Sequence, residues 1–117
     1  MKILIVDDSN IIRRAIEKYL HEFELECVGT AGDGESALVL FREYLPDIVT
    51  LDITMPRMDG LSCLEKIMQI KPDTRVLIIS ALKDAATGLQ AVRKGARGFL
   101  AKPFTQQELK EEIMLCL

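Results

Sequence analysis

The sequence predicts an α/β fold in which five parallel strands form one sheet and five helices cover both of its faces. Short runs rich in Ile, Val and Leu, which suit strands buried on both faces, alternate with segments whose apolar residues have helical spacing. The alternation is strict along the whole chain, and a strand–helix–strand unit implies a right-handed crossover onto a parallel sheet. We therefore expect a doubly wound, five-stranded parallel sheet.

The five strands are expected from runs of two kinds. The segments Ile3–Val6, Ile48–Leu51 and Val76–Ile79 are rich in Ile, Val and Leu, as is typical of the buried centre of a parallel sheet. In Glu24–Cys27, acidic and apolar residues alternate, which predicts a half-exposed strand at one edge. The short segment Phe99–Ala101 is expected to form the strand at the other edge.

The five helices are expected from apolar stripes between the strands. The stripe residues are Ile11, Ile12, Ala15, Ile16, Tyr19 and Leu20; Ala37, Leu38, Phe41 and Leu45; Leu64, Ile67 and Met68; Leu89 and Val92; and Leu109, Ile113 and Cys116. Pro46 and Pro72 follow the second and third stripes, and proline is a common helix stop. Thr105 and Glu108 have the spacing of a capping box ahead of the last helix.

Length and composition argue against several classes of protein. A chain of 117 residues has the size of one domain, so we expect a single domain over residues 1–117. The net charge of −3 argues against direct nucleic-acid binding, which needs a basic face. No apolar run approaches the roughly 18 residues of a membrane span. Three scattered cysteines, Cys27, Cys63 and Cys116, suggest reduced thiols. We expect a cytoplasmic protein that does not insert into membranes.

Polar residues stand at the ends of four expected strands. Asp7 and Asp8 follow the first strand, Asp52 follows the third, Ser80 ends the fourth, and Lys102 follows the fifth. The carboxyl ends of parallel strands share one edge of the sheet, where ligands bind. We therefore expect three carboxylates, one hydroxyl and one ammonium group to meet there.

Such a cluster of acids needs compensating charge. Two carboxylates about 4 Å apart repel by roughly 4 kcal/mol at an effective dielectric constant near 20. Any single one of these polar residues could instead serve as a helix N-cap: Asp8 or Ser9 for the first helix, and Ser80 for the fourth. As a cluster, the three acids are neutralised by Lys102 together with a hard divalent cation that takes oxygen ligands, most simply Mg²⁺. A neutral site of this kind can accept an incoming phosphoryl group.

Four segments give the chain a family resemblance. They are ILIVDDS, LDITMPRMDG, IISA and GFLAKPF, in that order and each at an expected strand end. With these segments the chain resembles, over residues 1–117, the receiver domains of two-component response regulators, and in particular the chemotaxis-type single-domain members. The resemblance implies a flavodoxin-like fold with strand order 2-1-3-4-5.

The resemblance also implies a role for each site residue. Asp52 is implied to be the phosphoacceptor. Asp7 and Asp8 are implied to hold Mg²⁺, together with Asp52 and the backbone carbonyl of Thr54. Lys102 and Ser80 are implied to contact phosphoryl oxygens during transfer.

Further positions follow from the same resemblance. Ala81 is implied to leave the phosphorus accessible, and Thr54 and Leu82 flank the site at positions that tune the decay of the acyl phosphate. Phe99 is implied to be an aromatic switch that turns from an exposed to a buried rotamer when Ser80 moves toward the phosphoryl group. The Lys102–Pro103 peptide bond is implied to be cis.

Partners are implied as well. The phosphodonor would be a phosphohistidine on a sensor histidine kinase or phosphotransfer protein, or a small phosphodonor. A downstream target would dock on the fourth helix, fifth strand and fifth helix, and a monomer or a weak phosphorylation-dependent dimer is expected. Basic residues on or beside this face suit an acidic target segment or self-association: Lys83, Arg93, Lys94, Arg97 and Lys110. We expect the protein to catalyse only its own phosphorylation and dephosphorylation, and so not to be an enzyme.

Gly88 lies inside the fourth expected helix. An interior glycine costs about 1 kcal/mol relative to alanine. We hypothesise that the segment Ala85–Lys94 is the least stable helix and shifts on phosphorylation. The alternative interpretation is that Gly88 allows close helix packing.

Three alternative functions stay open at this stage. The chain could be the receiver half of a longer regulator with a DNA-binding or enzymatic output domain. It could be a flavodoxin-like electron carrier, although that function needs a Ser/Thr- or Gly-rich loop where Asp7 and Asp8 stand. It could be a Mg²⁺-dependent phosphatase with an Asp nucleophile, although that class needs a second Asp where Thr54 stands.

Overall fold

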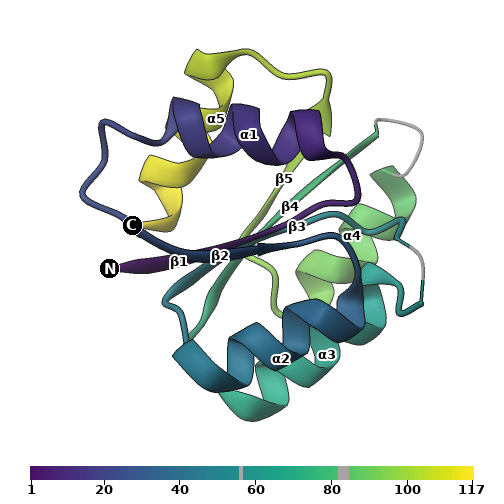
Figure 1. Ribbon diagram of the computed structural model, residues 1–117. Helices are drawn as coiled ribbons and strands as arrows, with labels where there is room; N and C mark the ends of the chain where they lie inside the picture. The colour runs from purple at the N-terminus through teal and green to yellow at the C-terminus, as the bar shows by residue number, and fades with distance from the viewer. Residues whose placement is uncertain (56, 82–84) are drawn as a thin grey trace.

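The computed structural model describes residues 1–55, 57–81 and 85–117, in which five strands alternate with five helices (Figure 1). The elements are β1 (Lys2–Val6), α1 (Asn10–Tyr19), β2 (Glu26–Ala31), α2 (Gly34–Tyr44), β3 (Ile48–Leu51), α3 (Gly60–Ile70), β4 (Arg75–Ala81), α4 (Ala85–Arg93), β5 (Gly98–Lys102) and α5 (Gln106–Cys116). All strand pairs are parallel and the sheet order is β2-β1-β3-β4-β5, which confirms the predicted fold.

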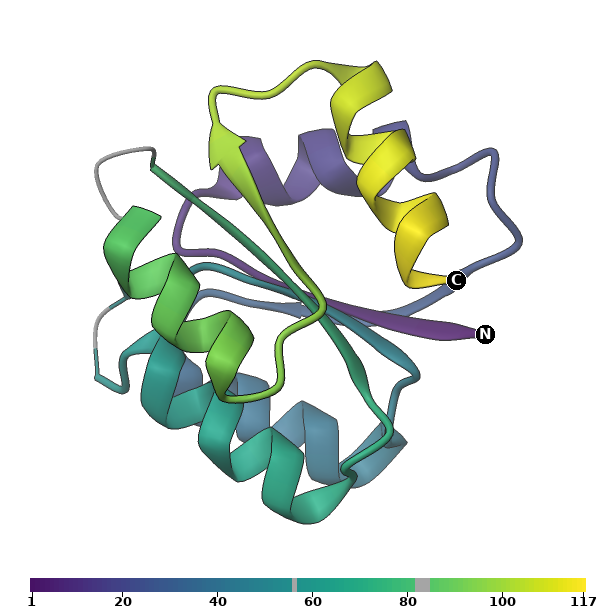
Figure 2. The ribbon, with the colours of Figure 1, turned by 180° about the vertical axis from the view of Figure 1, so that it is seen from behind.

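The sheet is covered on both faces. Helices α1 and α5 lie on one face, and α2, α3 and α4 lie on the other, as Figures 1 and 2 show from opposite sides. Successive strand residues point to opposite faces, so Ile3 and Ile5 join the α1/α5 core while Leu4 and Val6 join the core under α2, α3 and α4. Each fully buried aliphatic side chain of this kind contributes roughly 1.5–3 kcal/mol. The runs of Ile, Val and Leu exist because both faces are buried.

Two predicted helix starts are resolved by their hydrogen bonds. The Ser9 hydroxyl accepts from the Ile12 backbone N–H at 3.3 Å, so Ser9 rather than Asp8 caps α1. The Thr105–Glu108 capping box is present, with reciprocal bonds of 3.1 and 2.9 Å. The Asp8 carboxylate is therefore not used as the N-cap of α1.

The edge strand β2 differs from its prediction. It begins at Glu26 rather than Glu24 and continues to Ala31. Its register with β1 slips between Ile3 and Leu4, which pair with Cys27 and Gly29. Simple alternation therefore breaks after Cys27, which is why the pattern indicated only the start of the strand.

Four residues of the predicted stripes are exposed rather than buried. Ile11 is 79% exposed because it lies roughly 140° around α1 from the buried Ile16. Leu45, 47% exposed, is the left-handed C-cap of α2 with φ of 45°. In α4, Leu89 and Val92 are 55% and 40% exposed, and the buried positions are small residues.

None of the helices in the described part of the chain combines the length and the hydrophobicity that crossing a membrane requires.

Candidate functional site

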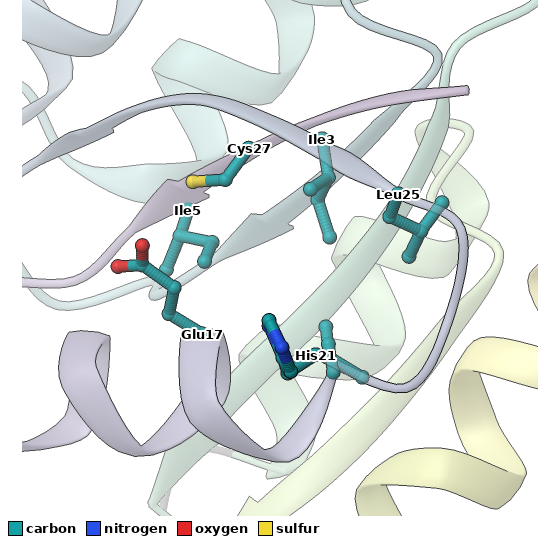
Figure 3. A pocket seen from close by; sticks show the side chains of 7 residues that line it. Ile3, Ile5, Glu17, His21, Leu25 and Cys27 are labelled. Atoms are coloured by element: carbon teal, nitrogen blue, oxygen red, sulfur yellow. The ribbon is translucent and has the colours of Figure 1, made fainter.

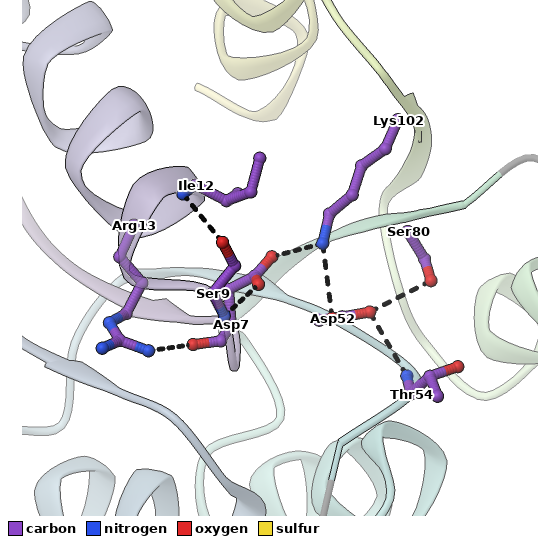
Figure 4. Close-up of polar contacts among 8 residues, drawn as sticks. All are labelled: Asp7, Ser9, Ile12, Arg13, Asp52, Thr54, Ser80 and Lys102. Atoms are coloured by element: carbon purple, nitrogen blue, oxygen red, sulfur yellow. Dashed lines mark hydrogen bonds and ion pairs between the residues drawn. The ribbon is translucent and has the colours of Figure 1, made fainter.

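The acids predicted to meet at the carboxyl edge of the sheet do so. Asp7 follows β1 and Asp52 follows β3, and one carboxylate oxygen each from Asp7, Asp8 and Asp52 lies within 4.8 Å of the others. Asp7 and Asp52 are buried, whereas Asp8 is exposed. Figure 4 shows Asp7 and Asp52 both facing Lys102, and Asp52 also facing Ser80.

Lys102, the last residue of β5, places its ammonium group between two of the acids. Its Nζ lies 2.6 Å from Asp7 Oδ2 and 3.4 Å from Asp52 Oδ2 (Figure 4). Three carboxylates against one ammonium leave an excess of two negative charges in the cluster when all are ionised. Carboxylate oxygens are the ligands of hard divalent cations, so both the donor set and the residual charge fit Mg²⁺.

Asp52 is held by hydrogen bonds on the side away from Lys102. Its Oδ1 accepts from the Ser80 hydroxyl at 3.0 Å and from the Thr54 backbone N–H at 3.2 Å. Ser80 is buried in β4, so its hydroxyl is fixed by the sheet itself. The hydroxyl predicted to contact a phosphoryl oxygen thus already contacts the expected phosphoacceptor. The metal-binding role of the Thr54 carbonyl stays a prediction.

Burial and neighbouring charges shift the pKa values of Asp52 and Lys102. Burial raises the pKa of Asp52, and the Asp7 carboxylate raises it further, while Lys102, Ser80 and Thr54 lower it; the net pKa lies above its ordinary value of 3.8. Burial lowers the pKa of Lys102, but the hydrogen bonds and charges of Asp7 and Asp52 outweigh burial, so its net pKa lies above 10.5. Lys102 is therefore a cation at neutral pH.

Three residues outside the predicted set shape the site. The Ser9 backbone N–H donates to Asp7 Oδ1 at 2.9 Å, and the Arg13 guanidinium donates to the Asp7 backbone carbonyl (Figure 4). A Cβ on Gly60 would lie 2.4 Å from the Asp52 carbonyl oxygen, so the start of α3 can approach β3 only with glycine there. The glycine in the segment MDG was the available signal for this contact, whereas Arg13 gave none beyond its position one helical turn into α1.

The remaining predicted positions are distributed as follows. Ala81 pairs with Lys102 across β4 and β5 and is partly buried. Phe99 is partly buried and packs against the core beneath α2, α3 and α4, rather than standing exposed as expected for the resting state. The Lys102–Pro103 bond is cis, as predicted. Leu82 and Lys83 lie outside the described residues.

The predicted basic face carries less free positive charge than expected. Lys94 pairs with Glu65 of α3 at 2.5 Å, and Lys110 pairs with Glu22, between α1 and β2, at 2.7 Å. In the described part of the chain, the predicted basic residues without an ion pair are Arg93 and Arg97. Side-chain reach across elements, which the sequence pattern does not reveal, explains the difference.

A hollow of about 210 Å³ lies elsewhere, between α1 and β2 (Figure 3). Its lining residues are Ile3, Ile5, Glu17, Leu20, His21, Leu25 and Cys27. Burial raises the pKa of the Cys27 thiol, a backbone hydrogen bond with Gly29 lowers it, and the Glu17 charge raises it, with a net rise. The three cysteines are free thiols, as predicted. The acids of the candidate site do not line this hollow.

Comparison with known proteins gives concordant results. The sequence profile described as the response regulator receiver domain matches residues 3–114. A protein from Listeria monocytogenes named chemotaxis protein CheY is 40% identical over 113 residues, covering 97% of this chain and 95% of that protein. A protein-glutamate methylesterase/protein-glutamine glutaminase from Syntrophomonas wolfei is 43% identical over 121 residues, covering 97% of this chain but 34% of that protein.

A solved structure supports the same family. A chain in the crystal structure of the CheX-CheY-BeF3-Mg+2 complex from Borrelia burgdorferi superposes with a TM-score of 0.91 and 36% sequence identity, covering 97% of this chain and 87% of that chain.

The raised pKa of Asp52 predicts how stability depends on pH. A carboxyl group whose folded-state pKa exceeds its unfolded-state pKa binds its proton more tightly when folded, so its ionisation opposes folding. Asp52→Asn should therefore be more stable than the wild type at neutral pH without divalent cations. This advantage should shrink as pH falls from above the raised pKa of Asp52 to below 3.8.

Urea denaturation of both proteins across this pH range measures the difference. Asp73→Asn, at an exposed position away from the site, is the matched control and should show no such trend. A lower stability of Asp52→Asn at neutral pH would contradict a raised pKa of Asp52 in the folded state.

Proposed function

This chain belongs to the response regulator receiver domain family and is homologous to CheY proteins, and from that premise we propose that it is a phosphorylation-dependent signalling switch with Asp52 as its phosphoacceptor. The observation that carries the proposal is the set of contacts around Asp52. Of the three clustered acids, Asp52 is the one bonded to a hydroxyl, a backbone amide and an ammonium group at once. These are the groups that phosphoryl transfer requires around the phosphorus.

The proposed reaction needs no general base. The Asp52 carboxylate attacks the phosphorus of a phosphohistidine, a new O–P bond forms, and the N–P bond breaks with its electron pair left on the imidazole nitrogen, which takes a proton from solvent. Decay of the signal reverses the modification: water attacks the phosphorus and the aspartyl carboxylate leaves. Ala81 would keep the phosphorus accessible, and Thr54 and Leu82 would tune the rate of this decay.

The chain's own groups stabilise the developing charge. Lys102 Nζ is already 3.4 Å from Asp52 and is proposed to move onto a phosphoryl oxygen. The Ser80 hydroxyl is proposed to transfer its hydrogen bond from Asp52 Oδ1 to a second phosphoryl oxygen. Both residues lie on the adjacent strands β4 and β5, so the sheet already holds their backbones in place and only their side chains need to move.

The divalent cation would be held by Asp7, Asp8 and Asp52, with the Thr54 backbone carbonyl as a further ligand. The three carboxylates lie close enough together to share one ion. When bound, Mg²⁺ would neutralise charge on the phosphoryl oxygens. The BeF3 and Mg+2 named for the Borrelia burgdorferi complex support the same assignment here.

The proposed partners follow from the family. A sensor histidine kinase or phosphotransfer protein would supply the phosphoryl group, and a downstream protein would bind the face formed by α4, β5 and α5. The CheX named in the Borrelia burgdorferi complex supports binding of a separate protein. We propose a cytoplasmic monomer, or a weak dimer after phosphorylation, that acts on no separate substrate and has one domain over residues 1–117.

A second candidate is the receiver half of a longer regulator. The Syntrophomonas wolfei methylesterase supports this candidate, because its matching region is one part of a longer protein. The family membership favours both receiver candidates over an electron carrier or a phosphatase. In either case the chemistry at Asp52 is the same.

Acetyl phosphate tests the phosphoacceptor directly. With Mg²⁺ present, the wild type should gain the mass of one phosphoryl group, and Asp52→Asn should gain none because the amide is not a nucleophile. Asp73→Asn should label like the wild type. Full labelling of Asp52→Asn in intact-mass spectrometry would place the phosphoacceptor elsewhere.

Removal of the metal tests the proposed role of the acid cluster. Adding a chelator should abolish labelling by acetyl phosphate, and excess Mg²⁺ should restore it, because without the cation the residual negative charge repels the phosphodonor. Asp8→Asn should need a higher Mg²⁺ concentration for half-maximal labelling. Labelling that persists undiminished in chelator would remove the metal from the mechanism.

A further inference from the structure

Gly88 of α4 lies directly against the ring of Phe99 of β5. A Cβ built on Gly88 would lie 2.3 Å from Phe99 Cδ2 and 2.5 Å from Cε2. Carbon atoms in van der Waals contact are about 3.5–4.0 Å apart, so the ring occupies space that any side chain at position 88 would need. The Phe99 ring can hold its position because residue 88 is glycine.

The rest of α4 reinforces this arrangement. Ala91, one helical turn from Gly88, is fully buried, whereas the larger Leu89 and Val92 point outward and are exposed. The inner surface of α4 is therefore made of small residues, and the aromatic ring fills the space that a larger helix residue would otherwise fill. Gly88 and the Phe99 ring are thus packed directly against each other where α4 meets β5.

This contact is connected to the candidate site through paired strands. In the parallel register of β4 and β5, Ile78 pairs with Phe99 and Ser80 pairs with Ala101. Ser80 in turn donates its hydrogen bond to Asp52. The ring contact on Gly88 is thus two residues along the same strand pair from the hydroxyl that contacts Asp52.

We propose that Gly88 is a positioning residue: because it has no Cβ, it leaves beside α4 a space that the Phe99 ring occupies, which we call the seat. The seat sets the balance between the inward and the outward position of the ring before phosphorylation. A residue with a Cβ at position 88 displaces the ring outward. A phosphorylated site that favours the inward ring by some factor is itself favoured by the inward ring by that same factor, because coupling between sites is reciprocal. Loss of the seat should therefore weaken phosphoryl binding. The coupling to phosphoryl binding rests on the proposed function, whereas the contact between Gly88 and the Phe99 ring does not.

A double-mutant cycle on the unphosphorylated protein tests the seat. Alanine in place of an interior helix glycine normally raises the folding equilibrium constant about fivefold. Gly88→Ala should show no such gain in the wild type, because the Cβ meets the ring, but should show it in a Phe99→Ala background. Thr87→Ala, on the neighbouring position, should have the same effect in both backgrounds. An equal gain from Gly88→Ala in both backgrounds would overturn the proposal.

The position of the ring can be read independently. In protein labelled with 4-fluorophenylalanine, the ¹⁹F resonance of Phe99 is assigned from its loss in Phe99→Leu. Gly88→Ala should move this resonance toward the value of the unfolded chain, as expected for a solvent-exposed ring, and Thr87→Ala should leave it in place. A Phe99 resonance unmoved by Gly88→Ala would refute the seat.

Beryllofluoride with Mg²⁺, a mimic of the phosphoryl group, tests the link to Asp52. Gly88→Ala should bind it more weakly than the wild type, because coupling between the ring and the site is reciprocal, while Thr87→Ala should match the wild type. Equal affinity of Gly88→Ala and the wild type would overturn the coupling between the Phe99 ring and Asp52. The double-mutant cycle tests the seat separately. Failure of the wild type to bind beryllofluoride or to label at Asp52 would instead count against the proposed function.

Discussion

Three carboxylates crowd together at one edge of the sheet, and their mutual repulsion governs the chemistry of the site. Parallel strands bring their carboxyl ends together, so Asp7 and Asp52 are buried side by side with Asp8 at the rim. Lys102 offsets part of the repulsion through contacts of 2.6 and 3.4 Å. Burial still raises the pKa of Asp52. The two hydrophobic layers of the fold hold together a cluster that would otherwise separate, which leaves the site ready for a cation and a phosphoryl group.

The same few contacts hold Asp52 and connect it to the rest of the molecule. Ser80 bonds to Asp52, and the strand pair that carries Ser80 also carries Phe99, whose ring rests on Gly88. A change at the carboxylate therefore has a short path to α4, made of one hydrogen bond, one strand pair and one ring contact. A packed core supports two discrete arrangements of such a ring better than a continuum.

The sequence predicted the fold and the members of the acid cluster, because both depend on local signals. Two buried faces produce the Ile, Val and Leu runs, and strand ends place Asp7, Asp52 and Lys102 at one edge. What it could not predict depends on contacts between elements. Leu89 and Val92 have the spacing of a core stripe, yet the Phe99 ring already fills the space beneath α4. Lys110 was expected on an open basic face, yet its ammonium group reaches Glu22.

In the proposed function, Lys102 and a divalent cation together neutralise one acid cluster. Calorimetric titration of Mg²⁺ into Lys102→Met measures whether the two positive charges act on the same carboxylates. If the two positive charges balance the same carboxylates, removing the ammonium group frees Asp7 and Asp52 and Mg²⁺ should bind several-fold more tightly than to the wild type. Unchanged or weaker Mg²⁺ binding by a folded Lys102→Met would show that the ammonium group and the cation do not balance the same carboxylates.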